Sequence, residues 1–141
     1  MKTLQSLCVL VLSLCLSGLY ARAQDSPQKT AQMAAAETWL SQVDAGDYVI
    51  SWREASPYFQ GAVTEQAWTA SLNGVRKPLG KVMSRKLQSA QHTKSVPGAP
   101  DGNYVVMQFD TRFENKQAAV ETVTFMQEKD GKWKAAGYYI N

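Results

Sequence analysis

Arg85 and Glu121 are the two residues whose types and positions most suggest chemistry. Arg85 lies two residues before the apolar Leu87, and Glu121 lies two residues before the apolar Val123. In a strand, residues two apart point to the same face, so both charges are expected to point into the core. Burying either charge alone costs several kcal/mol. We therefore expect them to pair with each other as a structural ion pair, or to form an anion-binding arginine oriented by Glu121.

An acid–base enzyme acting on an apolar substrate would use the same carboxylate. Such a site needs a carboxylate and a hydrogen-bond donor in an apolar pocket, and Glu121 with Tyr138 is the candidate pair. Asp110 alternates with polar neighbours and is expected to face solvent. Tyr138 joins Glu121 only if the last hairpin has a two-residue turn, whereas a bulged turn would place Trp133 and Tyr139 on that face. With no fuller catalytic set, we favour binding over catalysis.

No other pattern indicates a metal, a cofactor or a nucleic acid. His92 is the only histidine, and a metal site would need companions. The sequence contains no Gly-x-Ser-x-Gly nucleophile motif and no Gln-x-Val-x-Gly loop of the cystatin type. Basic residues cluster only briefly, at Arg76–Lys77 and Arg85–Lys86, so no continuous basic face is expected. We expect no cofactor, no metal and no nucleic-acid partner.

The N-terminus has the pattern of a cleavable export signal. Lys2 precedes an apolar run over residues 7–19, and Ala21 and Ala23 occupy the positions that a signal peptidase reads. The run is roughly 13 residues, too short for a membrane-spanning helix of about 20. We expect cleavage between Ala23 and Gln24, no membrane anchor, and a periplasmic or secreted protein.

Residues 24–141 are expected to form a single domain. Both cysteines, Cys8 and Cys15, lie in the signal, so the remainder has no disulfide. The formal charge falls from +3 to about +1 once Lys2 and Arg22 are removed. About 118 residues is an ordinary domain size, and the four tryptophans are untypical of a disordered segment.

Three helices are expected in the first half of this domain. The first covers about residues 28–45, the second 48–55, and the third begins after the N-cap Thr64. The spacing of their apolar residues predicts the buried faces. These are Ala36, Trp39, Leu40 and Val43 in the first helix, and Trp68, Leu72 and Val75 in the third.

Four strands are expected after Pro78, where the apolar period changes to two. They cover about residues 79–91, with Leu79, Met83 and Leu87 on one face, then 104–113, 119–128 and 133–140. A loop of about five residues after the second strand would place Thr111 opposite Glu121 and Phe109 opposite Val123. Helices followed by a four-stranded antiparallel meander predict an α+β fold, with the N-terminal helices packed on one face of a curved sheet.

Several separate blocks of the chain resemble a known family. They are Trp39-Leu40 with Asp44, Gly46 and Tyr48, Ser51-Trp52 with Ala55-Ser56, Arg76-Lys77-Pro78-Leu79-Gly80 with Ser84-Arg85, Tyr104-Val105-Val106, Glu121-Thr122-Val123, and Asp130-Gly131-Lys132-Trp133 with Gly137-Tyr138-Tyr139. Together they resemble a family of exported bacterial proteins catalogued as domain-of-unknown-function family 4019. This resemblance implies little chemistry, because the name of the family states that its role is unknown. The element order is also similar to cystatin-like and nuclear-transport-factor-like cones, which host binding modules, assembly domains and enzymes alike.

The leading interpretation is an exported, non-enzymatic domain. It would bind a small ligand or an envelope protein in the concave face of its sheet, through Arg85, Glu121 and Tyr138. A second interpretation is a structural module of the cell envelope that forms a homodimer through the convex face, where the outward side chains would be Thr122, Thr124 and Met126. A small acid–base enzyme is the third.

Overall fold

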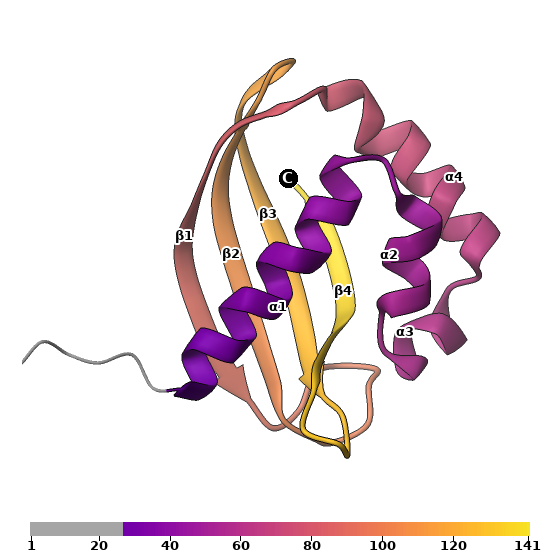
Figure 1. Cartoon of the computed structure of the whole chain (residues 1–141), viewed down its shortest axis with the longest axis vertical. Coiled ribbons are helices and arrows are strands. Elements are labelled where there is room, and N and C mark those ends of the chain that lie inside the picture. Colours follow the sequence, from indigo (N-terminus) through magenta and orange to yellow (C-terminus); the bar gives the residue numbers. More distant parts are fainter. Residues whose placement is uncertain (1–26) are drawn as a thin grey trace, which may run out of the picture.

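Four helices and a four-stranded antiparallel sheet make up the computed structural model, which describes residues 27–141 (Figure 1). The helices are α1 (Pro27–Asp44), α2 (Tyr48–Glu54), α3 (Pro57–Ala62) and α4 (Glu65–Val75), followed by the 3₁₀ turn η1 (Lys77–Leu79). The strands are β1 (Val82–Thr93), β2 (Tyr104–Phe113), β3 (Lys116–Gln127) and β4 (Trp133–Ile140). The chain is therefore an α+β protein. The expected signal peptide, residues 1–23, lies outside the described residues.

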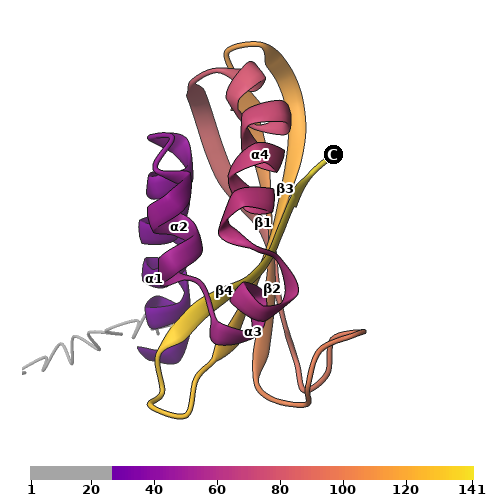
Figure 2. The same ribbon diagram turned by 90° about the vertical axis from the view of Figure 1, so that its right-hand side faces the viewer.

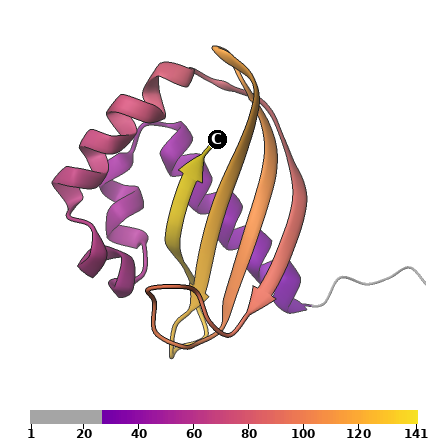
Figure 3. The ribbon, with the colours of Figure 1, turned by 180° about the vertical axis from the view of Figure 1, so that it is seen from behind.

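The helices lie on one side of a curved sheet whose strands follow the order β1-β2-β3-β4. Helix α1 crosses the concave face diagonally, and α2 to α4 lie beside β4 (Figure 1, Figure 2). Seen from behind, the convex face carries no helix of the described part of the chain (Figure 3). Within residues 27–141, no helix is both long and apolar enough to span a membrane.

Helix α1 presents its expected apolar stripe to the sheet. Ala36, Trp39, Leu40 and Val43 are all buried and belong to one core with Trp68 and Leu72 of α4. The expected third buried residue of α4, Val75, is instead exposed. Arg76, four residues after Leu72, takes that inner position and is only 3% exposed.

Helix α3 was not predicted from the sequence. Ser56 and Pro57 were expected only to end the preceding helix. The Ser56 hydroxyl also accepts a hydrogen bond from the Phe59 amide at 3.1 Å, and Pro57 occupies the first helical turn. Proline is favoured there because the first helical N–H groups have no partner within the helix. The Ser56 amide donates to the Ala135 carbonyl at 2.8 Å, which ties this junction to β4.

Two expectations about β1 were wrong. Leu79 lies in η1, and Met83 is exposed because the strand has a bulge between Val82 and Ser84. A bulge adds one residue and reverses the alternation on one side of it. Arg85 and Leu87 lie beyond the bulge and still face inward, opposite Thr111 and Phe109.

The connection between β2 and β3 is shorter than expected. Phe113 pairs with Lys116, so only two residues form the turn, and Glu121 lies opposite Phe109 instead of Thr111. The register differs from the expected one by two residues. Because a strand has a side-chain period of two, this shift leaves Glu121 on its expected face.

The last hairpin matches neither of the two expected alternatives in full, because it places Trp133 and Tyr138 on the inner face. Thr124 pairs with Gly137 but Phe125 pairs with Ala135, so β4 has a bulge at Ala136. The alternation reverses there, and both Trp133 before the bulge and Tyr138 after it pack against the core. Tyr139 is exposed on the other face.

Candidate functional site

Glu121 is completely buried in the middle of β3, where its carboxylate accepts hydrogen bonds from residues of the three other strands. Arg85 of β1 donates through Nε to Oε1 at 2.7 Å and through Nη2 to Oε2 at 3.1 Å. The Thr111 hydroxyl donates to Oε1 at 2.6 Å, and the Tyr138 hydroxyl donates to Oε2 at 2.6 Å. A carboxylate has about four lone-pair positions, so these four contacts satisfy it.

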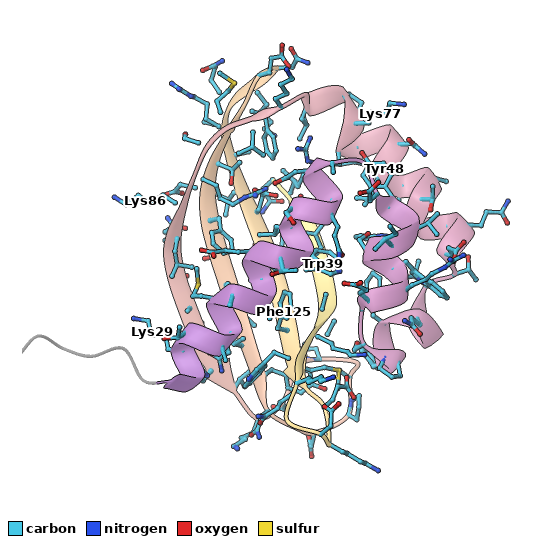
Figure 4. The ribbon with its side chains drawn as sticks, in the orientation of Figure 1. Lys29, Trp39, Tyr48, Lys77, Lys86 and Phe125 are labelled. Carbon is cyan, nitrogen blue, oxygen red and sulfur yellow. The ribbon has the colours of Figure 1, made fainter. Side chains whose placement is uncertain are left out.

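The guanidinium of Arg85 also reaches the last residue of α1. Its Nη1 and Nη2 donate to the two carboxylate oxygens of Asp44 at 2.7 and 2.9 Å. Arg85 is thus held between two carboxylates, and 17% of its side chain is exposed. The exposed Lys86, next in the sequence, points away from the helices (Figure 4).

Arg76 completes the group, which we call the charged cluster: Arg76, Asp44, Arg85 and Glu121. Its Nη2 donates to Asp44 Oδ1 at 3.2 Å and its Nη1 to the Gly80 carbonyl at 2.7 Å. Its guanidinium carbon lies 4.6 Å from the centre of the Phe113 ring. Two cations and two carboxylates therefore alternate beneath the end of α1, and their formal charges cancel.

The surroundings shift the pKa values of Arg85 and Tyr138. Burial alone would lower the pKa of the Arg85 guanidinium, but its bonds to Asp44 and Glu121 outweigh that effect and raise it. Burial raises the pKa of the Tyr138 hydroxyl well above its usual range, and the Glu121 carboxylate raises it further. Tyr138 is therefore a neutral donor at physiological pH. The pairing favours the structural ion pair over an arginine that is free to bind an anion.

A groove opens on the concave side between α1 and the beginning of β4. It has a volume of about 500 Å³, and we call it the α1–β4 groove. Its apolar lining consists of Ala34, Ala35, Trp39, Phe125, Trp133 and Ala135, and its polar lining of Thr38, Arg53, Glu54, Lys132 and Lys134. Figure 4 labels Trp39 of α1 and Phe125 of β3.

Trp39 links this groove to the charged cluster. Its indole N–H donates to the Ser51 carbonyl at 2.8 Å, which fixes the ring between α1 and α2. The ring centre lies 5.6 Å from that of Tyr138 and 6.2 Å from that of Phe125, both near edge-to-face. Such contacts stabilise aromatic pairs beyond the area they bury. Tyr138, which donates to Glu121, therefore also packs against the tryptophan in the wall of the groove.

A second, smaller cavity lies on the other side of α1. It measures about 210 Å³ and is lined by Arg85, Leu87 and Phe109 from the sheet and by Asp44 and other residues of α1. Arg85 thus borders a cavity, but its three nitrogens already donate to Asp44 and Glu121.

The model of a family described as a protein of unknown function, DUF4019, matches residues 35–138. The chain belongs to this family. The match begins in the middle of α1 and ends at Tyr138, so it contains the whole charged cluster. A search of curated proteins finds no match to the chain.

The structure brings together the three residues that the sequence singled out in this DUF4019 member, Arg85, Glu121 and Tyr138. Asp110 is exposed, as expected. The sequence reading missed Asp44 and Arg76 as partners. One signal was available: a carboxylate at a helix C-terminus opposes the helix dipole, so Asp44 indicates a compensating cation.

Proposed function

We propose that this chain is an exported, non-enzymatic binding domain whose small ligand occupies the α1–β4 groove. The observation that carries the proposal is the groove itself. Its volume of about 500 Å³ falls in the range of about 300–1,000 Å³ that small-molecule sites occupy. Its lining is mainly apolar and aromatic with a few polar groups, which is the composition such sites have.

The charged cluster supports binding over catalysis. A general base must have a lone pair free to take a proton from a substrate. The lone pairs of Glu121 already accept from Arg85, Thr111 and Tyr138. In this proposal Tyr138, one of the three predicted ligand-binding residues, acts on the ligand indirectly, through its contact with the Trp39 ring in the groove wall.

Export is the second part of the proposal, and it is supported by the N-terminal sequence. A positive residue, a short apolar run and small residues before Gln24 form the pattern of a cleavable signal. The ligand would then be one that this domain meets in the periplasm or outside the cell.

The binding proposal is tested by titrating the purified protein with 1-anilinonaphthalene-8-sulfonate, a fluorescent amphiphile. Ala34→Trp places a large ring in the groove, whereas Ala70→Trp places the same ring on the exposed face of α4. We expect saturable fluorescence with the unchanged protein and with Ala70→Trp, and at least about tenfold weaker binding with Ala34→Trp, equivalent to about 1.4 kcal/mol. Near-UV circular dichroism verifies that all three proteins are folded. Equal binding by all three would refute a site in the groove.

A further inference from the structure

We infer that the α1–β4 groove selects an organic cation, a small molecule with an apolar body and one positively charged ammonium group. This inference rests on the binding function proposed above and specifies the chemistry of its ligand. It is carried by Glu54, a carboxylate that borders the groove and forms no ion pair within residues 27–141.

The positive side chains at the border of the groove point elsewhere. Lys132 and Lys134 alternate with Trp133, which packs against the core, so their ammonium groups extend from the opposite face of the sheet. Arg53 Nε lies 3.1 Å from Glu65 Oε2, so its charge is paired with a carboxylate of α4. These three cations therefore leave the charge of a ligand in the groove uncontested.

Glu54 is held toward the groove by a residue of α1. Its Oε2 accepts a hydrogen bond from the Gln42 amide at 2.6 Å, which fixes the side chain between the end of α2 and α1. An amide is neutral, so it orients the carboxylate without cancelling its charge. Glu54 is exposed, and a ligand can reach the carboxylate from solvent. The groove therefore has a negative charge at the end that meets α2.

The aromatic lining begins at the same end of the groove. The indole N–H of Trp39 donates to the Ser51 carbonyl, and Glu54 lies three residues after Ser51 on α2. Residues three apart are neighbours on a helix surface, so the carboxylate lies beside the ring. Tryptophan rings also attract cations. The ammonium group would lie at Glu54, and the apolar body would extend past Trp39 toward Trp133, beside the small side chain of Ala35.

The test compares three ligands with the same ten-carbon chain and different headgroups: decylammonium, decanol and decanoate. Binding is measured by tryptophan fluorescence below micelle-forming concentrations, and near-UV circular dichroism verifies that each variant is folded. We expect decylammonium to bind about fivefold more tightly than decanol, since a partly exposed charge pair contributes a modest attraction. Decanoate should bind most weakly. The preference for decylammonium should decrease as salt increases.

Glu54→Gln tests the carboxylate directly, because glutamine still accepts the hydrogen bond from Gln42 but carries no charge. This variant should bind decylammonium and decanol equally, and Glu54→Lys should reverse the preference in favour of decanoate. The anionic 1-anilinonaphthalene-8-sulfonate should bind Glu54→Gln more tightly than the unchanged protein. The control is Glu37→Gln, which removes an exposed carboxylate of α1 outside the groove lining and should keep the preference.

Equal binding of decylammonium and decanol by the unchanged protein, weakened by Ala34→Trp, would overturn the inference and leave the binding function standing. A preference for decylammonium that Glu54→Gln retains would do the same. Binding that Ala34→Trp does not weaken, or no binding of the three ligands and of 1-anilinonaphthalene-8-sulfonate, would overturn both.

Discussion

The neighbours of Glu121 replace the water that its carboxyl group lacks in the interior. An isolated buried carboxylate is unfavourable by several kcal/mol, and the penalty is removed only when good hydrogen bonds satisfy the remaining lone pairs. Arg85, Thr111 and Tyr138 do this from three different strands. The hydrogen bonds to Glu121 can therefore all form only when β1, β2, β3 and β4 pair in the correct register.

Replacing Arg85 should be strongly destabilising. Arg85→Met leaves the buried Glu121 and the Asp44 carboxylate without their shared cation, and breaking a buried pair in this way costs about 3–5 kcal/mol. Because 17% of Arg85 is exposed, we expect the lower end, about 3 kcal/mol. Urea denaturation measures the loss, with the exposed neighbour Lys86→Met as the control. An unchanged free energy of unfolding for Arg85→Met would show that the pair of Arg85 and Glu121 does not stabilise the fold.

Tyr138 should make stability sensitive to alkaline pH. Burial and the Glu121 carboxylate raise the pKa of Tyr138 in the folded protein, while an unfolded tyrosine has a pKa of about 10. Above pH 10 only the unfolded chain releases the proton, so the free energy of unfolding falls by about 1.4 kcal/mol per pH unit. Below pH 10 both states keep the proton and this contribution is fully present.

Tyr138→Phe removes the proton and therefore makes this alkaline decline shallower. The same variant should be less stable at pH 7, by about 1–2 kcal/mol, because Glu121 loses one donor. Urea denaturation from pH 7 to 11 measures both effects, with the exposed Tyr139→Phe as the control. Parallel pH profiles for Tyr138→Phe and the unchanged protein would contradict the assignment.

At the level of the elements, the end of α1 is held by charge. Asp44 opposes the helix dipole, an unfavourable position for a carboxylate at a C-terminus. Arg85 and Arg76 compensate for it from β1 and from the segment after α4. The carboxylate thus connects the helix to two segments that lie more than thirty residues away in the chain.

Asp44→Asn should lower stability even though it removes an unfavourable helix–dipole interaction. The favourable dipole change is about 0.3–1 kcal/mol, whereas the nearly buried Arg76 and Arg85 lose charge-assisted bonds of about 1.5–3 kcal/mol. We expect a net loss of about 1–2 kcal/mol, measured as a lower midpoint of thermal unfolding. Asp47→Asn, at an exposed position just after the helix, is the control. A midpoint for Asp44→Asn that is equal to or higher than that of the unchanged protein would contradict the role of Asp44.

The strand irregularities decide which side chains surround the site. The bulge at Ala136 turns both Trp133 and Tyr138 inward, so one strand supplies the groove with an aromatic residue and Glu121 with a donor. In a regular strand one of them would point outward, because they are an odd number of positions apart and side chains alternate between the two faces.

For the whole molecule, the ligand-binding interpretation and the structural homodimer interpretation predict different oligomeric states. Binding in the α1–β4 groove needs one copy of the chain, while the homodimer interpretation needs contact through the convex face, where Tyr139 is exposed. We expect a monomer in sedimentation velocity across the accessible concentration range. A dimer that Tyr139→Ser dissociates would favour the envelope-assembly interpretation instead.

The sequence predicted the elements well wherever local spacing decides them. The stripe of Trp39, Leu40 and Val43 follows from the helical period, and the inward position of Glu121 follows from strand alternation. That position survived an error in the expected register because the error was two residues, a full period of the strand. Met83 and Val75 were misplaced because a bulge and a buried arginine changed the local pattern.

The α+β class, the element order and the inward parity of Arg85 and Glu121 could all be read from the chain, because each depends on residues close together in sequence. The partners of Arg85, the bulge at Ala136 and the α1–β4 groove could not. Each depends on which segments meet across the fold. Those meetings are set by the packing of α1 onto the curved sheet, a long-range property that no local pattern encodes.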